Sequence, residues 1–253
     1  MNILKRIQSK ISDIGLFNFI GFAMRYSFIN KKKTDYQAML SKDSNKEKFT
    51  EIYKKNFWHS SESGSGMGSE VIYTEKLRLW LLKNLPEYDV SRFVDAACGD
   101  FNWMKLVIPK LNVEYYGFDI VDSVIAENIA KYSNDQIHFA VADICNDKLP
   151  DCDFLMIRDC LFHLSFHDIN SFLTNLSQTN YKFLLTTTHL LQSDHINEDI
   201  ISGHFRHIDL FKKPFNLKER NIVERFEDAI KGFTPREMIL IAKENVPKNL
   251  GYE

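Results

Sequence analysis

The chain has 253 residues, of which 44% are hydrophobic and 26% are charged, and its formal net charge at pH 7 is −2. This length suits one large domain or a domain with an appendage, and the composition is that of an ordinary globular protein. A nearly neutral charge argues against a dedicated nucleic-acid binder, which is normally clearly basic. The four cysteines form no Cys-x-x-Cys pair, so we expect reduced thiols in a cytoplasmic protein.

Residues 1–57 are predicted to form a helical cover that precedes the main domain. Ile3, Ile7 and Ile11 recur at helical spacing, which is typical of an amphipathic helix. Residues 14–29 are the most apolar early stretch, but polar residues interrupt them and no small-residue cleavage pattern follows, so neither a membrane span nor a secretory signal is predicted. A helix packed on the domain or on a partner chain is favoured over a helix lying weakly on a membrane surface.

A segment rich in glycine and serine follows at residues 58–70. Gly64, Gly66 and Gly68 imitate a dinucleotide-binding motif, but no strand precedes them and no βαβ unit encloses them. Two interpretations stay open: a mobile loop that closes over a ligand and leads into a helix with Ser69 as its N-cap, or a flexible linker.

From residue 91 onward, apolar strand-like runs alternate with helical patterns, which indicates a parallel sheet covered on both faces. The predicted strands are Arg92–Ala97, Glu114–Ile120, Gln136–Ala142, Asp153–Ile157 and Tyr181–Thr187, with a closing hairpin of Ile222–Phe226 and Glu237–Ala242. The predicted helices are Phe101–Val107, Asp122–Tyr132 and Asp168–Leu176, the last capped by Ser165 or His167. Residues 189–220 interrupt this alternation, and long irregular segments in compact domains usually carry function.

Aspartates end the first three strands, where ligands of open α/β sheets bind: Asp95, Asp119 and Asp143. Asp119 lies 24 positions after Asp95 (119 − 95), about where an acid bonds a ribose hydroxyl in a dinucleotide site. NAD also needs a cradle of several glycines around its pyrophosphate, and the first turn, DAACGDF, offers only Gly99. S-adenosylmethionine (SAM) has a ribose, an adenine amino group and cationic groups but no pyrophosphate, so the pattern favours SAM. An NAD-linked sugar-modifying enzyme is the alternative.

The segments DAACGDFNW, YGFDI, VADI and DFLMIRDCLFHLS, in this order, resemble the motifs of class I SAM-dependent methyltransferases. Ala97 and Phe101 stand at the outer positions of the usual D/E-x-G-x-G-x-G motif, a departure that resembles a bacterial polysaccharide-modification subgroup with C-G-D-F-x-W and R-D-C-L-x-H-L motifs. The resemblance covers residues 58–215. It implies a Rossmann-like, mostly parallel seven-stranded sheet with helices on both faces and a reversed last strand. The side chain of Phe101 is expected to face away from the cofactor or to line its methionine end.

On this resemblance, residues 58–253 form the SAM-binding methyltransferase domain, and the excursion at 189–220 binds the substrate. The expected cofactor contacts are Asp95, Ala97, Cys98, Gly99, Asp100, Trp103, Asp119, Ile120, Asp143, Ile144 and Arg158. An oxygen acceptor must also lose a proton, so a base is needed. The candidate bases are Asp159, His163 and His189, with a helix cap as the alternative role of Asp159 and a core imidazole as that of His163. The expected substrate contacts are Ser65, His204 and Arg206.

The predicted activity is methyl transfer from SAM to an oxygen of a small polar acceptor, phosphorylated or sugar-like, with S-adenosylhomocysteine (SAH) as product. The resemblance places it in bacterial capsule or surface-polysaccharide synthesis, with the O-methyl phosphoramidate pathway as the most specific hypothesis. N-methylation of a similar metabolite and a non-catalytic SAM-binding subunit are further alternatives. The histidines of the excursion fit no metal-ligand spacing, so no metal is expected. We expect a cytoplasmic monomer or homodimer without nucleic acid or stable membrane insertion.

Overall fold

The computed structural model describes residues 33–230 and 232–251. The isoleucine pattern and the apolar stretch at residues 14–29 lie outside this range. The chain divides into two compact units, residues 1–42 and 43–253, and the fold described here is that of the second unit. This unit includes helix α3 (Asn45–Lys54), which begins at a capping box made by Ser44 and Glu47. A helix from the predicted cover thus shares a unit with the sheet.

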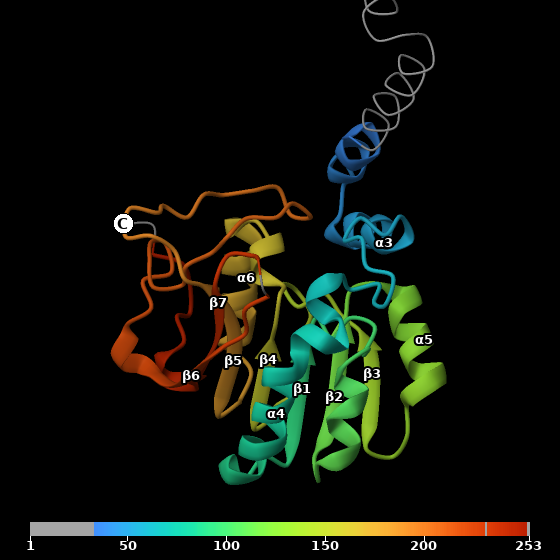
Figure 1. The fold of residues 1–253 in the computed structure, drawn as a ribbon, viewed down its shortest axis with the longest axis vertical. Helices are drawn as coiled ribbons and strands as arrows, with labels where there is room; N and C mark the ends of the chain where they lie inside the picture. The colour runs from blue at the N-terminus through green and yellow to red at the C-terminus, as the bar shows by residue number, and fades with distance from the viewer. Residues whose placement is uncertain (1–32, 231, 252–253) are drawn as a thin grey trace, which may run out of the picture. The chain divides into compact units, whose positions relative to one another are not determined.

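Seven strands of the described chain form a sheet in the order β3-β2-β1-β4-β5-β7-β6 (Figure 1). The strands are β1 (Arg92–Ala96), β2 (Glu114–Asp119), β3 (Ile137–Val141), β4 (Phe154–Ile157), β5 (Phe183–His189), β6 (Ile222–Glu227) and β7 (Arg236–Ala242). The first five pair in parallel, and β7 is antiparallel to both β5 and β6. The predicted mostly parallel sheet with a reversed last strand is confirmed, as is the closing hairpin.

Alternate strand residues supply two separate cores because neighbouring side chains on a strand point to opposite faces. On one face, Phe93, Phe154 and Leu185 pack with helices α4 (Glu75–Asn84) and α5 (Asp122–Tyr132). On the other face, residues such as Val94 and Leu184 pack with α6 (Phe166–Leu176). The buried middle strands therefore appear in the sequence as continuous apolar runs rather than alternating ones.

Helix α6 begins at Ser165, whose Oγ accepts a hydrogen bond from the backbone N–H of Asp168 at 3.1 Å. This confirms Ser165 as one of the two predicted caps. The helix predicted at Phe101–Val107 is wrong: the structure has two short 3₁₀ turns, Met104–Leu106 and Ile108–Lys110. Phe101 has a φ of +56°, outside the helical region, and Pro109 in the second turn has no N–H to continue a helix.

The helix expected to start at Ser69 begins later. Two 3₁₀ turns, Met67–Ser69 and Val71–Thr74, precede α4, and Ser69 is not its N-cap. The carboxylate of Glu62 accepts the backbone N–H of Val71 at 2.8 Å. The side chain of Glu62, in the preceding loop, therefore accepts a hydrogen bond from the backbone N–H that begins the second 3₁₀ turn.

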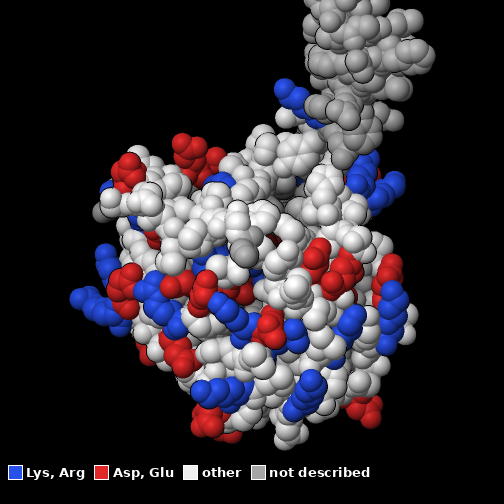
Figure 2. Space-filling view, viewed as in Figure 1, with Lys and Arg blue, Asp and Glu red and all other residues white. Residues whose placement is uncertain are grey.

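Lysine, arginine, aspartate and glutamate are interspersed on the face shown in Figure 2, rather than sorted into a basic stripe. The four cysteines are free thiols. Within the part of the chain that is described, every helix is too short or too polar to cross a membrane.

Candidate functional site

A cavity lies at the carboxyl edge of the sheet, with about 890 Å³ of empty space when the solvent at its mouth is included. Most of the residues expected from the sequence line it, namely Ser65, Asp95, Ala97, Cys98, Gly99, Trp103, Asp119, Ile120, Asp143, Ile144, Arg158, Asp159 and His163. Asp100, His189, His204 and Arg206 are not among the described residues that form its walls.

The turn after β1 adopts a left-handed backbone at every second residue. Ala97, Gly99 and Phe101 have φ values of +70°, +60° and +56°, so the three glycine positions of the methyltransferase motif keep their conformation although two of them carry side chains. A left-handed non-glycine residue costs roughly 1–2 kcal/mol. Phe101 offsets this cost by burial: it is 2% exposed and packs against the rings of Tyr115 and Phe139. Its side chain therefore faces the core, one of the two orientations expected.

Gly99 is required by a close approach within the protein. A Cβ atom at this position would lie 2.2 Å from Oγ of Ser65. Ser65 in turn accepts the backbone N–H of Asp100 at 3.0 Å and contacts the hydroxyl of Tyr53 at 2.8 Å. On the far side of the turn, the side-chain amide of Asn128 in α5 donates to the carbonyl of Gly99 at 2.7 Å. The turn is thus held from both sides.

The segment at residues 58–70 is fastened to the sheet edge through Asp100. The Asp100 carboxylate accepts hydrogen bonds from the hydroxyl of Ser63 (2.9 and 3.0 Å), from the backbone N–H of Gly64 (2.8 Å) and from the hydroxyl of Ser65 (3.2 Å). The same carboxylate was expected to contact the cofactor. In the structure its partners are the serines and backbone of this segment.

The glycines of the same segment permit close packing. A Cβ at Gly66 would lie 2.8 Å from Cβ of Trp58, and a Cβ at Gly68 would lie 2.6 Å from Oδ2 of Asp159. Gly66 also has a φ of +91°, which favours glycine. The glycine spacing that imitates a phosphate-binding loop therefore follows from the fit of the segment against its neighbours.

Two acids of the cavity carry raised pKa values. Burial raises the pKa of Asp119 to about 6, although its carboxylate accepts backbone N–H groups from Gly99 (3.1 Å) and Val121 (3.0 Å). Burial also raises the pKa of Asp95 to about 7, and the hydroxyl of Tyr115 donates to this carboxyl group at 2.8 Å. In both cases the protein stabilises the negative charge only partly. Such carboxylates would be stabilised further by a ligand that carries a positive charge or donates hydrogen bonds.

Asp143 combines a structural role with its place in the cavity wall. Its carboxylate accepts the backbone N–H of Cys145 at 3.0 Å and the side-chain amide of Asn146 at 2.8 Å. These bonds fix the turn after β3, which brings Ile144 to the cavity as well.

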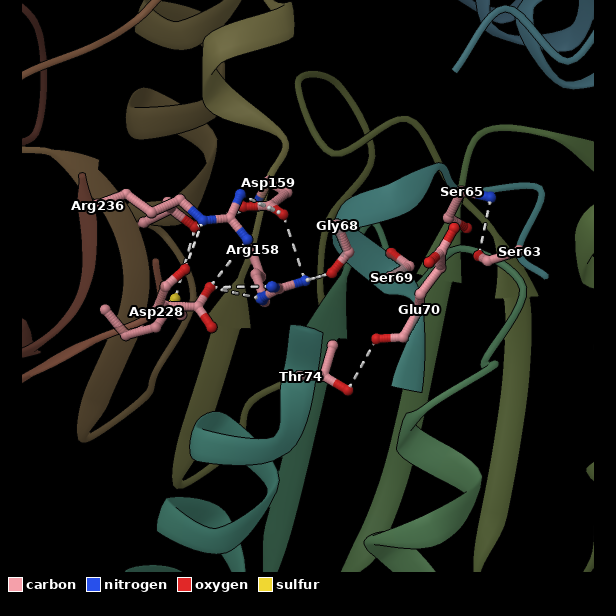
Figure 3. A network of polar contacts seen from close by, with 12 residues as sticks. Ser63, Ser65, Gly68, Ser69, Glu70, Thr74, Arg158, Asp159, Asp228 and Arg236 are labelled. Atoms are coloured by element: carbon pink, nitrogen blue, oxygen red, sulfur yellow. Dashed lines mark hydrogen bonds and ion pairs between the residues drawn. The ribbon is translucent and has the colours of Figure 1, made fainter. Parts of the chain in front are cut away.

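A network of alternating charges joins Arg158 and Asp159, which follow β4, to Asp228 and Arg236 (Figure 3). Arg158 binds Asp228 at 2.9 Å and Asp159 at 3.3 Å, and Arg236 binds Asp159 at 2.8 Å and Asp228 at 3.2 Å. Arg158 also donates to the carbonyl of Gly68 at 2.9 Å, which ties the loop to β4. The two guanidinium groups hold the pKa of Asp159 at about 2 although burial opposes this.

His163 is the imidazole of the cavity wall. Its Nδ1 lies 2.8 Å from the backbone carbonyl oxygen of His204. Because a carbonyl oxygen only accepts, Nδ1 carries the proton and Nε2 presents its lone pair. Burial lowers the pKa of His163 below 6.5, so the ring is neutral at pH 7. The excursion at residues 189–220 thus sets the tautomer of a residue that follows β4.

Helix α3 and Trp58 form an aromatic wall that the sequence interpretation missed. Phe49, Tyr53 and Trp58 line the cavity, and Asn45 lines it beside them. The ring of Trp58 lies 5.3 Å from that of Tyr53 and 5.3 Å from that of His163. The short apolar stripe of α3 was the available signal, and it was interpreted as part of the cover.

The remaining candidates lie outside the cavity wall. His189 is buried, its Nδ1 faces the backbone of Ile208, and its pKa is lowered to about 4 by burial. Arg206 is also buried: Nη1 donates to the carbonyl of Leu164 at 2.6 Å, and its guanidinium lies 4.9 Å from the centre of the Phe166 ring. Its Nε and Nη2 have no hydrogen-bond partner among the described residues. No group of three or more metal-ligating side chains is found in the described chain.

No protein-family model matches the chain, and no curated protein matches it in sequence. Solved structures match its fold. One is 1,6-didemethyltoxoflavin N1-methyltransferase of Burkholderia thailandensis with bound 1,6-didemethyltoxoflavin and SAH, at 10% identity and a TM-score of 0.59 over 83% of this chain and 89% of that chain. A SAM-dependent methyltransferase of Leishmania major matches at 14% identity and 0.57 over 81% and 89%.

Magnesium protoporphyrin IX methyltransferase of Synechocystis PCC 6803 with bound SAM matches at 12% identity and a TM-score of 0.50, over 87% of this chain and 95% of that chain. At these identities the similarity concerns the fold alone. The chain has the Rossmann-like fold of class I SAM-dependent methyltransferases, as the motif resemblance predicts.

Proposed function

We propose that this protein is a SAM-dependent methyltransferase that acts on a small molecule. The observation that carries the proposal is the acidic edge of the cavity, where Asp95, Asp119 and Asp143 lie at the carboxyl ends of three adjacent parallel strands. This set of groups fits SAM. Asp119 would bind the ribose hydroxyls, Asp143 the adenine amino group, and Asp95 the cationic methionine end. When bound, SAM supplies a methyl group already activated by its sulfonium.

The charge of the cavity favours SAM over NAD. Its described walls carry four carboxylates, from Asp95, Asp119, Asp143 and Asp159, and one guanidinium, from Arg158. Arg158 is already bound by Asp159 and Asp228. A pyrophosphate would therefore meet negative charge without an available cation, whereas a sulfonium and an ammonium group meet complementary charge.

His163 is the base that we favour. Its neutral ring has an unprotonated Nε2, as a proton acceptor must. Asp159 is less suited, because two guanidinium groups stabilise its ionised form and keep its pKa at about 2. His189 lies outside the cavity wall. Asp159 is more easily understood as part of the frame that positions Gly68 and the segment at residues 58–70.

The acceptor atom follows from this assignment. A neutral imidazole that removes a proton suits a hydroxyl acceptor, since an amine acceptor is a nucleophile without losing its proton first. O-methylation is therefore the preferred reaction, and N-methylation is the alternative. The placement in capsule or surface-polysaccharide synthesis, including the O-methyl phosphoramidate hypothesis, stays a prediction from the motif resemblance and is an alternative to the phenolic acceptor inferred from the cavity.

Isothermal titration calorimetry with SAH and with NAD⁺ tests the proposed cofactor. We expect SAH to bind the intact protein with a micromolar or lower dissociation constant and NAD⁺ to bind at least 100-fold more weakly. Binding of NAD⁺ with no binding of SAH by folded protein would contradict the proposal and favour the dehydrogenase or epimerase alternative.

A further inference from the structure

The acceptor side of the cavity differs from the side where the cofactor acids lie. Asp143, the expected adenine contact, and Ile144 follow β3, whereas Trp58 and His163 meet each other near Asp159 and Cys160, which follow β4. The two sides are separated in the sheet by β2 and β1. The wall made by Trp58 and His163 therefore lies toward the β4 side of the cavity and away from Asp143.

The protein holds this wall in place. Gly66 has no side chain, and a Cβ there would collide with Cβ of Trp58 at 2.8 Å. Tyr53 packs edge-on against the indole with ring centres 5.3 Å apart, and the His163 ring is fixed by its bond to the carbonyl of His204. A rigid aromatic surface of this kind binds flat rings by stacking at little entropic cost.

The cations that a phosphorylated acceptor needs lie elsewhere. Arg206 is buried against Phe166 and outside the cavity wall. Lys212 hydrogen-bonds the carbonyl of Gln192 and lies 3.8 Å from Asp209. With Arg158 bound by two carboxylates, a phosphate dianion in the cavity would face like charges with no partner, which is strongly unfavourable in a partly desolvated site.

The base also discriminates between kinds of hydroxyl group. Burial lowers the pKa of His163 below 6.5, so its imidazole is a weak base. A phenol, with a pKa of about 10, is a far better proton donor to it than an aliphatic sugar hydroxyl.

We infer that the acceptor is an uncharged phenolic compound whose ring stacks against Trp58, with its hydroxyl directed to Nε2 of His163. This inference rests on the proposed methyltransferase function and names its substrate class. In the reaction the phenolic proton passes to Nε2 of His163. An electron pair of the oxygen forms the new bond to the methyl carbon, and the electron pair of the broken carbon–sulfur bond stays on sulfur, which leaves SAH and an aryl methyl ether.

The test uses the full chain and a panel of uncharged phenols with one to three rings, beside glucose, glucose 6-phosphate and inorganic phosphate. Transfer of labelled methyl from SAM is measured for each, and the phenols are also titrated calorimetrically into SAH-loaded protein. We expect label on phenols and none on the two sugars, and no binding of inorganic phosphate.

Two matched tryptophan variants test whether phenol binding depends on the wall made by Trp58 and His163. Trp58→Leu should weaken phenol binding by tenfold or more. Trp80→Leu removes an indole that stacks on Phe226, away from the cavity, and should leave phenol binding unchanged. Label on glucose 6-phosphate, label on no phenol, or equal effects of the two variants would overturn the inference. Failure of SAH to bind wild-type protein would instead contradict the methyltransferase function itself.

Discussion

The edge formed by β1–β3 and the edge formed by β4, β5 and β7 both carry buried aspartates, but the protein treats them in opposite ways. On the first edge, Asp119 is bonded by two backbone N–H groups and its pKa rises to about 6. On the second edge, Asp159 and Asp228 share two arginines: the pKa of Asp159 falls to about 2, whereas burial still raises the pKa of Asp228. The first edge leaves negative charge for a ligand, whereas the second neutralises it within the protein.

The largest effect expected on the second edge comes from removing Arg158. Arg158→Ala leaves Asp228 and Asp159 with Arg236 alone and breaks the bond to the Gly68 carbonyl. Loss of one partner from a buried ion network costs about 3–5 kcal/mol, which urea unfolding measures. Arg225→Ala removes an arginine paired with Glu219 and Glu237 nearer the surface and should cost less than about 1 kcal/mol. Equal losses would contradict the buried, charge-balancing role given to Arg158.

Replacing His163, the proposed base, should reduce catalysis more than binding. His163→Gln is expected to lower methyl transfer by about 10²–10⁴, the usual contribution of a general base, while SAH affinity changes little. The pH profile is the second readout: the wild-type rate should rise as His163 loses its proton below pH 6.5, and the variant should lack this rise. His167→Gln, an exposed histidine of α6, is the control. A variant that keeps the wild-type rate would favour Asp159 as base.

The role of Asp95 at the first edge can be tested by measuring protein stability as a function of pH. Its pKa is raised from an ordinary 3.8 to about 7 by burial, so the ionised form is the costly one. The stability that the protonated carboxyl provides is fully present below pH 3.8 and is lost as the pH rises through 7. The free energy of unfolding of Asp95→Asn, relative to wild type, should therefore rise by about 2 kcal/mol between pH 5 and pH 8. Parallel pH profiles would show that Asp95 is not held in this way.

The smallest effect concerns the turn. Gly99→Ala places a Cβ 2.2 Å from Oγ of Ser65 at a φ of +60°, and we expect a loss of about 2 kcal/mol, of which about 1 is backbone strain. Ser65→Gly in the same chain removes the collision. The two changes should therefore couple by at least about 0.5 kcal/mol in a double-mutant cycle, and strict additivity would contradict the assigned contact.

The strands could be predicted to within a few residues because β1, β4 and β5 are buried on both faces and each contains adjacent apolar residues, as in Phe154–Ile157. The acids of the first edge were predictable because each lies in or within two residues of the carboxyl end of its strand. The helix at Phe101–Val107 was not, because the left-handed φ of Phe101 depends on an aromatic core supplied by Tyr115 and Phe139 from other strands.

Arg158, Asp159 and His163 were predicted as site residues, but the ion network around Arg158 and Asp159 was not, because its contacts are distant in sequence. Arg158 and Asp228 are 70 residues apart, and Asp159 and Arg236 are 77 apart, so no local pattern connects them. The aromatic wall was missed because the apolar positions of α3, Phe49 and Tyr53, are also what a helix packed on a core would show.

The most direct test of the account is SAH affinity in a matched pair of aspartate variants. Asp119→Ala removes the buried carboxylate that the cavity offers to a ribose, and Asp122→Ala removes an exposed carboxylate of α5 that pairs with Lys46. Calorimetry should show at least a 50-fold loss of SAH affinity for Asp119→Ala and less than a twofold change for Asp122→Ala. Wild-type affinity in a folded Asp119→Ala protein would contradict the claim that the first edge holds the cofactor.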